Sequence, residues 1–378
     1  MWGELEKQYD TLALKENILT LAESVKRTFH LEDNRIEEAA AKLRECSNII
    51  LTGAGDKYII PCISKIVWRH FSKKPVEVYH SRSLCEQNLL LDDETAVIFL
   101  SQSGATYDTI QAYKKLSSKI KLSIWVTNLK EQSPGSIYNL KTDNCIILNT
   151  HTVKYPEKPI ISTSTFQTTL ALLNDLLLTV IDTSESLNLK KIQREKLPNL
   201  IEEATRSSKL IEWSKRTAEE LMKHRNETFY VLGDGVRYLI ALKQATIMFM
   251  EGCKQDACPI RTEEFIHSLI ETLEPENPVK KPLILLNPHS SFSSETMLNT
   301  VKYITKMWRK HAGKDKIFLI SPYNFIKSEL YGNTGDLLSP ALYAIPLMWL
   351  TYYYALSLRV DPGISKLVTK IRRKSLKA

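Results

Sequence analysis

Short apolar runs alternate with amphipathic segments along most of the chain, and this alternation predicts an α/β fold. From about residue 5 to residue 46 the apolar positions recur at helical spacing, and Asp33-Asn34 supplies a cap between two predicted helices. From Asn48 onward, short apolar runs predict strands buried on both faces, each followed by a helix-compatible segment. Strands that alternate with helices predict a parallel sheet covered by helices on both faces. The predicted strands are 48–52, 76–79, 96–100, 122–127 and 145–148.

The same pattern restarts in the second half, after a charged helical stretch over residues 182 to about 226. The run Phe229–Gly235 resembles Ile49–Gly55, and an apolar helix follows each of them. Residues 283–291 take the place that residues 97–103 hold in the first half. Because corresponding pieces recur at about the same spacing, we expect a duplicated domain.

The last part of the chain completes this organisation. Residues 316–320 predict a further strand, and residues 341–358 form a helix that is apolar nearly all round and therefore buried between the halves or in an oligomer interface. We expect two tandem three-layer α/β/α domains, each a parallel sheet flanked by helices, with an N-terminal helical extension. The predicted parts are an N-terminal helical segment (1–46), a first domain (47–182), a helical connector (183–226), a second domain (227–345) and a C-terminal helix and tail (346–378).

Composition narrows the class of protein. The 378 residues are 43% hydrophobic and 25% charged, as in soluble globular proteins. The net charge of +8 suits anionic substrates, but the basic residues are spread out and only Lys370–Lys377 is a dense run, so we expect no nucleic acid partner. The six cysteines lack metal-ligand spacing and predict reduced thiols. The N-terminus does not resemble a signal peptide and no apolar run reaches membrane-spanning length, which predicts a cytoplasmic protein without a membrane partner.

The stretch Ser101–Thr106 predicts an anion site. It lies where a strand gives way to a helix N-terminus, which collects unpaired N–H groups and the positive end of the helix dipole. Ser101, Ser103 and Thr106 add hydroxyl donors, and Gly104 lets the backbone approach a ligand closely. An ordinary helix cap is the alternative, but a cap needs one hydroxyl and this stretch offers several.

Two other loops are candidates for the same pocket. Gly53-Ala54-Gly55 follows the first strand but lacks the third glycine of a dinucleotide-binding fingerprint, so a tight turn and a ligand contact are equally good interpretations. The hydroxyl run Ser162–Thr165 follows the last strand of the first half and precedes an apolar helix, Leu170–Ile181. It can form a second wall of the anion pocket or merely cap that helix.

The second half carries the candidate acid and base residues. Glu251 ends a strongly apolar helix, where a carboxylate is costly unless it is paired or used, and such a setting can raise its pKa into the range of proton transfer. Glu264 and His267 are three residues apart and can share a helix face, although such a pair is more often a surface salt bridge than a catalytic pair.

These pieces together resemble the sugar isomerase (SIS) domain family of phosphosugar isomerases and phosphosugar-binding regulators. The resemblance extends from about Asn48 to Thr369 and is closest to proteins with two SIS domains: the isomerase part of glucosamine-6-phosphate synthase, glucosamine-6-phosphate deaminases and amino-sugar ketose/aldose isomerases. The stretch SQSGATYDT at 101–109 is similar to the family's phosphate loop. Residues 156–166 and 361–369 are similar to the family's PE…ST…F and C-terminal DxPxxLSKxVT segments.

The resemblance implies a role for each matching residue. It assigns the sugar phosphate to Ser101, Gln102, Ser103 and Thr106, and contact with the sugar to Ser162. Glu251 would move a proton between C1 and C2 of the sugar, and His267, supplied by the neighbouring subunit of a homodimer, would open the ring. Lys366 would reach the open-chain carbonyl, for which an amine that can form a Schiff base is apt. The enediol route needs a base and an electrophile, so we expect no metal and no organic cofactor.

Three departures from the family pattern bear on the reaction. In the loop after the first strand, Asp56 and Lys57 follow Gly55 where the family has threonine and serine, and we expect Gly55, Asp56 and Lys57 to face the sugar. Ile247 and Met248 occupy the region of a lysine that usually stands one turn before the catalytic glutamate. His267 is followed by Ser268-Leu269 instead of Gly-Pro.

The sequence therefore leaves two functions open. The preferred one is a phosphosugar isomerase acting on a sugar 6-phosphate, an amino sugar in particular, with deamination as a variant of that chemistry. The alternative is a non-catalytic phosphosugar-binding or regulatory SIS protein. We expect no room for a glutamine-hydrolysing domain, which favours isomerisation or deamination over synthesis.

Overall fold

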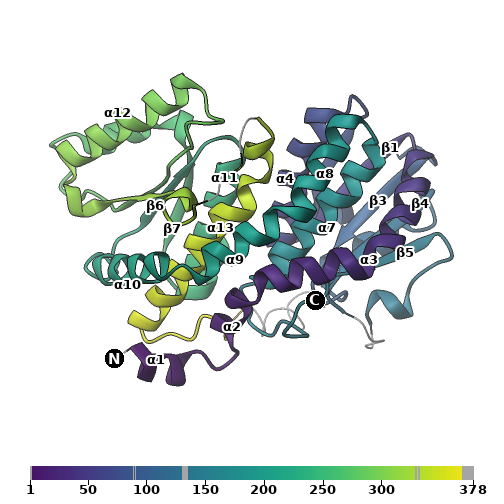
Figure 1. Cartoon of the computed structure of the whole chain (residues 1–378), viewed down its shortest axis with the longest axis horizontal. Coiled ribbons are helices and arrows are strands. Elements are labelled where there is room, and N and C mark those ends of the chain that lie inside the picture. The colour runs from purple at the N-terminus through teal and green to yellow at the C-terminus, as the bar shows by residue number, and fades with distance from the viewer. Residues whose placement is uncertain are drawn as a thin grey trace. The chain divides into compact units, whose positions relative to one another are not determined.

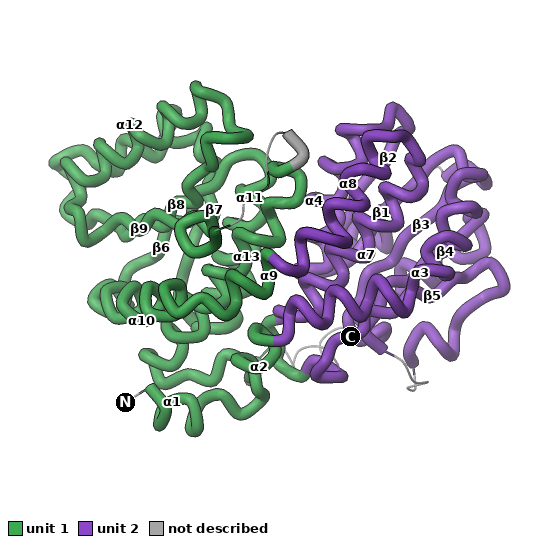
Figure 2. The backbone as a smooth tube through the Cα atoms, viewed as in Figure 1, with its two compact units in different colours: residues 1–19, 158–161, 200–378 green, residues 20–157, 162–199 purple. Residues whose placement is uncertain are grey.

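Two parallel β-sheets carry the fold, each between layers of helices (Figure 1). The computed structural model describes residues 2–87, 89, 91–129, 135–327, 330 and 333–367, without the side chains of 333 and 334. The chain divides into two compact units (Figure 2). Unit 1 consists of residues 1–19, 158–161 and 200–378, and unit 2 of residues 20–157 and 162–199. The domain bounds given above stay a prediction.

The sheet of unit 2 has the strand order β2-β1-β3-β4-β5, with every neighbouring pair parallel. Every residue of β3 and β4 is buried, as the continuous apolar runs predict. The strands lie within two residues of their predicted bounds. They are β1 (Asn48–Gly53), β2 (Val76–His80), β3 (Thr95–Leu100), β4 (Leu122–Thr127) and β5 (Cys145–Asn149).

Helices cover both faces of this sheet. On one face α3, α4 and α7 pack against the strands and one another, with α8 on α7; on the other face lie α5 and α6. The α6 side is filled by aromatic rings, with Phe99 stacked on Trp125 at 5.1 Å and Tyr113 edge-on to both. The helices are α3 (Leu21–Arg44), α4 (Asp56–Phe71), α5 (Ser81–Glu86), α6 (Tyr107–Leu116), α7 (Ser164–Ile181) and α8 (Ser184–Glu195), with a 3₁₀ turn at Ile137–Asn139.

The described residues of unit 1 repeat this arrangement with one strand fewer, in the order β7-β6-β8-β9 and again all parallel. The order matches β2-β1-β3-β4, which confirms the predicted duplicated fold. Helix α12 covers one face through Trp308, and α11, α13 and α10 form the other side. The strands are β6 (Phe229–Gly233), β7 (Ala257–Arg261), β8 (Leu283–Leu286) and β9 (Ile317–Ile320).

The helices of unit 1 include the apolar C-terminal helix α13, whose described side chains are almost all buried against α10 and α11. Helix α9 (Leu197–Arg206) crosses from one unit to the other. The helices are α1 (Trp2–Tyr9), α2 (Leu14–Leu19), α10 (Ser208–Met222), α11 (Gly235–Lys243), a π-helical continuation (Gln244–Cys253), α12 (Glu295–His311) and α13 (Asn333–Ser357). Short 3₁₀ turns lie at Thr262–Phe265, Leu269–Leu273, Lys314–Lys316 and Pro322–Asn324.

Three local predictions were wrong. The cap at Asp33-Asn34 does not exist, because α3 runs unbroken through it and the Asp33 carboxylate pairs with Arg194 at 2.7 Å. Strand β7 was not predicted; it is an edge strand, where Pro259 is tolerated. Helix α7 begins at Ser164, six residues before its predicted start, so Ser164 and Thr165 lie in its first turn.

Helix α7 also bears on the expectation that no segment could span a membrane. Among the described residues, α7 has the length and composition of a membrane-crossing helix, with a mean hydropathy of 1.2. However, 94% of this window is buried inside the protein, which is the situation of a core helix.

All six cysteines are free thiols.

Replacing Gly53 by alanine should destabilise unit 2. A Cβ at Gly53 would lie 2.1 Å from the backbone oxygen of Lys57, so α4 would have to move away from the end of β1. Forced overpacking of this kind costs about 1–3 kcal/mol. Chemical denaturation should show that loss for Gly53→Ala, whereas Gly3→Ala, where the new methyl group meets nothing within 4 Å, should leave stability unchanged or raise it. Equal stability of the two variants would contradict the tight turn.

Candidate active site

The predicted binding loops of unit 2 lie at the topological switch point of its sheet. Strands β1 and β3 are neighbours, and the helices that follow them, α4 and α6, lie on opposite faces. In an open parallel sheet, ligands bind outside the carboxyl ends of the strands at such a point. The loops Gly53–Lys57 and Ser101–Thr106 follow these two strands directly, so both lie at the carboxyl-end edge of the sheet.

The backbone of the Ser101–Thr106 loop is held from outside. Gly104 has φ +58°, and a Cβ there would lie 3.2 Å from the Thr127 hydroxyl. The carbonyl of Gly104 accepts a hydrogen bond from Ile137 N at 2.9 Å, and the Thr127 hydroxyl donates to the carbonyl of Gln102 at 3.2 Å. The loop is therefore preformed, as an anion site requires.

The side chain of the N-cap residue in the Ser101–Thr106 loop does not cap helix α6. Ser101 is buried, and its Oγ hydrogen-bonds to Thr106 Oγ1 at 2.8 Å. Thr106 is the N-cap of α6, yet its side chain makes no capping hydrogen bond, while Ser103 is exposed. The first-turn N–H groups of α6 are therefore not capped by Thr106, which favours the anion-site interpretation over the plain cap.

Glu157 joins this loop to the start of α7. Its carboxylate is buried and accepts hydrogen bonds from the backbone N–H groups of Thr163, Ser164 and Thr165 at 2.7–2.9 Å and from the hydroxyls of Thr163 and Thr165. Its carbonyl accepts from Gln102 Nε2 at 3.0 Å. The hydroxyl run is thus largely used to cap α7 through Glu157, with a carboxylate where the helix dipole favours one.

Asp56 and Lys57 are bonded internally. The Ser162 hydroxyl donates a short hydrogen bond to the Asp56 carboxylate, and Lys57, only 4% exposed, donates to the Thr165 carbonyl at 3.2 Å. Gly55 caps α4 with φ +63°. The hydrogen bonds of unit 2 therefore connect Gln102, Ser162, Asp56 and Lys57 around one edge of the sheet.

The corresponding edge of unit 1 is closed by ion pairs. Arg237 occupies the position that Lys57 holds after β1, and its guanidinium is 3% exposed. It is bidentate to Asp234 at 2.5 and 2.8 Å, pairs with Asp336, and lies over the ring of Tyr343. These carboxylates hold the pKa of Arg237 above its usual range despite burial, which lowers it. With two carboxylates to one cation, this edge does not suit an anion.

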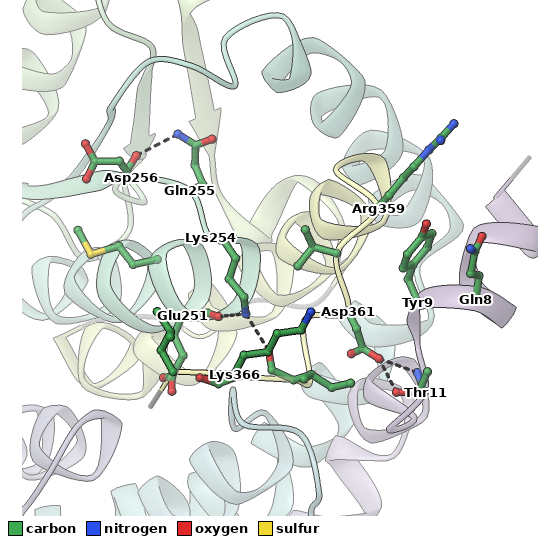
Figure 3. Close-up of a pocket in the computed structure, with 15 residues that line it drawn as sticks. Gln8, Tyr9, Thr11, Glu251, Lys254, Gln255, Asp256, Arg359, Asp361 and Lys366 are labelled. Atoms are coloured by element: carbon green, nitrogen blue, oxygen red, sulfur yellow. Dashed lines mark hydrogen bonds between the residues drawn. The ribbon is translucent and has the colours of Figure 1, made fainter. Parts of the chain in front are cut away.

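Unit 1 instead contains a pocket of about 930 Å³ lined by both Glu251 and Lys366 (Figure 3). Glu251 lies in the last turn of the π-helical segment Gln244–Cys253, a helix form that often accompanies functional sites. Lys366 follows α13 on the C-terminal segment. Two residues that the sequence predicts to act together thus line one pocket, although they are far apart along the chain.

Hydrogen bonds from three other parts of the chain hold the segment that carries Lys366. The Thr11 backbone N–H donates to Asp361 Oδ2 at 3.1 Å, Ile160 N donates to the Gly363 carbonyl at 2.9 Å, and Lys254 Nζ donates to the Ile364 carbonyl at 2.8 Å. Lys254 also donates to the carbonyl of Glu251 (Figure 3). Lys254 therefore fastens the Lys366 segment to the helix end beside Glu251.

Sequence reasoning missed Lys254. It takes φ +59°, a conformation that few lysines adopt, and the sequence carries no signal for this. Burial lowers the pKa of the Lys254 amine and the nearby Lys366 lowers it further, whereas Cys253, Glu251 and Asp361 raise it. The amines of Lys254 and Lys366 therefore line the pocket together with the carboxylates of Glu251 and Asp361.

His267 does not line this pocket. It is exposed in the turn after the 3₁₀ turn Thr262–Phe265, so Glu264 and His267 do not share a regular helix face as expected. Its assignment to a neighbouring subunit stays a prediction. Within the described residues, no group of three or more His, Cys, Asp or Glu side chains is placed to hold a metal ion.

The family model of the SIS domain matches residues 42–179, a range that includes the loops of unit 2 described above. These residues form a SIS domain. It contains all the predicted binding residues, from Gly55 to Ser162, whereas Glu251, His267 and Lys366 lie beyond the matched range.

Relatives extend over nearly the whole chain. The chain is 26% identical over 362 residues to the glutamine–fructose-6-phosphate aminotransferase (isomerizing) of Thermococcus kodakarensis, covering 94% of this chain and 56% of that protein. The chain thus spans about half the length of the curated relatives it matches.

Solved structures share the fold of the SIS domain and of the second half. The C-terminal domain of glucosamine-fructose-6-phosphate aminotransferase from Francisella tularensis has a TM-score of 0.73 at 21% identity, covering 95% of this chain and 99% of that one. Tagatose-6-phosphate ketose/aldose isomerase from Escherichia coli has a TM-score of 0.69 at 14% sequence identity, and the match covers 93% of this chain and 95% of that one. Glucosamine-6-phosphate deaminase from Thermotoga maritima has a TM-score of 0.63 at 16% sequence identity, and the match covers 96% of each chain.

Replacing Glu157 by glutamine should destabilise the SIS domain. The amide would set an N–H₂ group against backbone N–H donors of α7 and remove the charge that they solvate. We expect a loss of about 2–3 kcal/mol in the free energy of unfolding, measured by denaturant titration. Glu185→Gln, a matched change in the exposed first turn of α8, should cost less than about 1 kcal/mol. Similar losses in both variants would show that Glu157 acts only through the helix dipole.

Replacing Lys254 by methionine should loosen the C-terminal segment. The variant keeps the apolar stem but loses a charged hydrogen bond to the Ile364 carbonyl, so amide hydrogen exchange over residues 361–366 should rise about tenfold or more. Lys223→Met is the control, because Lys223 pairs only with Glu220 one turn earlier on α10. Unchanged exchange in Lys254→Met would rule out the fastening role.

Proposed function

We propose that this protein catalyses aldose–ketose isomerisation of a sugar 6-phosphate, with an amino sugar as substrate and deamination as the variant reaction. The observation that carries the proposal is that Glu251 and Lys366 line one pocket of unit 1. The proteins named above are described as an isomerizing fructose-6-phosphate aminotransferase, a tagatose-6-phosphate ketose/aldose isomerase and a glucosamine-6-phosphate deaminase, which supports an enzyme of this class.

In the proposed reaction the phosphate group binds at Ser101–Thr106. The first-turn N–H groups of α6 and the hydroxyls of Ser103 and Thr106 are the donors that a phosphate needs, and the preformed loop lowers the cost of binding. Gln102 Nε2 donates to the Glu157 carbonyl, and the proposal assigns its second N–H to the phosphate.

The proposed chemistry is a proton transfer through an enediol. Glu251 takes the proton from one of the two carbons C1 and C2 and returns it to the other, so the sugar is neither oxidised nor reduced overall. Lys366 polarises the open-chain carbonyl, and His267 of a neighbouring subunit opens the ring. Positioned acid–base groups of this kind contribute about 10²–10⁴-fold to a rate.

Replacing Glu251 by glutamine should abolish turnover and spare binding. We expect conversion of glucosamine 6-phosphate, or of fructose 6-phosphate with ammonia, to fall by about 10²-fold or more. Ligand should still raise the melting temperature, because binding to the native state stabilises it by mass action. Glu264→Gln removes an exposed carboxylate outside the pocket and is the matched control, with turnover unchanged.

A second function is favoured by the bonded state of Asp56 and Lys57. The Ser162 hydroxyl donates to the Asp56 carboxylate, and the Lys57 amine donates to the Thr165 carbonyl. These two side chains are therefore bonded to the protein at the positions where the resemblance places a sugar-contacting threonine and serine. This arrangement favours a phosphosugar-binding protein without turnover. A wild-type protein whose melting temperature rises with hexosamine phosphates, but which converts none of them, would establish this function in place of catalysis.

A further inference from the structure

Within the described residues, the second sheet has one strand fewer than the first. In unit 2, β4 is followed by β5, which pairs with its outer edge, and α7 begins only at Ser164. In unit 1, β9 ends at Ile320 and α13 already begins at Asn333. The chain between them is much shorter than its counterpart between Thr127 and Ser164. Among the strands that the structure describes, β9 is therefore the edge of its sheet, at the place where β4 has a partner.

The outer edge of β9 has no hydrogen-bond partner in the described part of the chain. Its ladder bonds run to β8, from Leu283 beside Ile317 to Leu286 beside Ile320, and Asn287 N donates to the Ile320 carbonyl at 2.8 Å. Among the described residues no further backbone or side-chain group bonds to Ile317–Ile320. Such an edge presents a row of unpaired N–H and C=O groups to another strand.

A basic groove of about 610 Å³ lies beside this edge. Helix α12 supplies cations one and two turns apart along one face, and Leu319 of β9 forms part of the wall. All of these cations are exposed, and within the described residues none of them makes an ion pair with a carboxylate. The cations of α12 are Lys302, Lys306, Arg309 and Lys310, and Lys314 of the following 3₁₀ turn adds a fifth.

We propose that the β9 edge and the basic face of α12 form a docking surface for an extended acidic peptide segment of a partner protein. The segment adds a fifth strand to the sheet of unit 1. Side chains alternate across a strand, so every second residue of the segment faces α12, and carboxylates there meet the lysines and the arginine. The backbone edge provides affinity and the cations select the sequence.

Charge and hydrogen bonding favour an acidic peptide over a second copy of the chain or a nucleic acid as the partner at this surface. A second copy of this chain paired edge to edge would bring two basic α12 faces together, and like charges disfavour that arrangement. A nucleic acid would satisfy the cations but has no peptide groups to pair with β9. An acidic peptide strand uses both features of the surface, and it is independent of the sugar-phosphate function proposed above.

The probe is a short labelled peptide that alternates glutamate with valine, titrated against the full chain by fluorescence anisotropy. We expect saturable binding at micromolar concentration that weakens with added salt. Bound peptide should slow amide hydrogen exchange in β9 (Ile317–Ile320), because its amides gain strand partners. The same peptide with alternate amides N-methylated should bind at least about tenfold more weakly, since it cannot complete the ladder.

Charge reversal on α12 tests the electrostatic half of the proposal. The double variant Lys306→Glu, Lys310→Glu should weaken peptide binding about tenfold or more. Lys7→Glu, Lys223→Glu makes the same change in net charge away from the groove and should bind as the wild type does. Both pairs are exposed, so both variants should fold, which the melting temperature checks.

Three outcomes would overturn the proposal. No peptide binding, or binding without protection of β9, would show that the edge accepts no strand. Equal binding of the N-methylated peptide and of a short thymidine oligonucleotide would reduce the groove to a general polyanion surface. A dimer in sedimentation velocity that the peptide dissociates would assign the edge to a second copy of the chain.

Discussion

One buried carboxylate, that of Glu157, holds the binding edge of the SIS domain together. A charge in a protein interior is costly unless it is fully hydrogen-bonded, and Glu157 meets this condition by accepting from the first turn of α7. Through its carbonyl the same residue also fixes Gln102 in the Ser101–Thr106 loop. The start of α7 thus depends on this side chain, and the main-chain carbonyl of the same residue ties the loop to it. Such a network specifies one arrangement strongly, because losing any member leaves a buried group unsatisfied.

The two repeats show how one fold diverges at equivalent positions. Gly53 and Gly233 both end a strand where a Cβ would collide with the backbone of the following helix, so the tight turn is common to both. Four residues later, Lys57 bonds to a carbonyl, whereas Arg237 is enclosed by Asp234 and Asp336. The first repeat keeps an open helix N-terminus at its switch point, and the second fills the same region with ion pairs. Only the first is left with the chemistry of an anion site.

Sequence patterns predicted the features that depend on neighbouring residues, namely the buried strands and the repeated turn. Continuous apolar runs located β3 and β4 because both faces of these strands are buried, and the repeated Gly-containing turn revealed the duplication. The misses depend on distant contacts. Asp33 pairs with Arg194 instead of capping a helix, and α7 starts at Ser164 because Glu157 caps it. Residue preference alone could not have located β7, since Pro259 is acceptable only at an edge, and edge position is a property of the whole sheet.

The candidate site was predicted unevenly for the same reason. The phosphate loop is one continuous stretch, so its chemistry is visible in sequence, whereas the pocket of unit 1 joins segments that only the fold brings together. Lys254 belongs to that pocket but does not replace the lysine that the family resemblance places one turn before Glu251. Its amine is bound to the carbonyls of Glu251 and Ile364, at the end of a helix where a cation is favoured. It therefore acts on Lys366 by holding its segment, and in the proposed reaction Lys366 is the amine that reaches the sugar carbonyl.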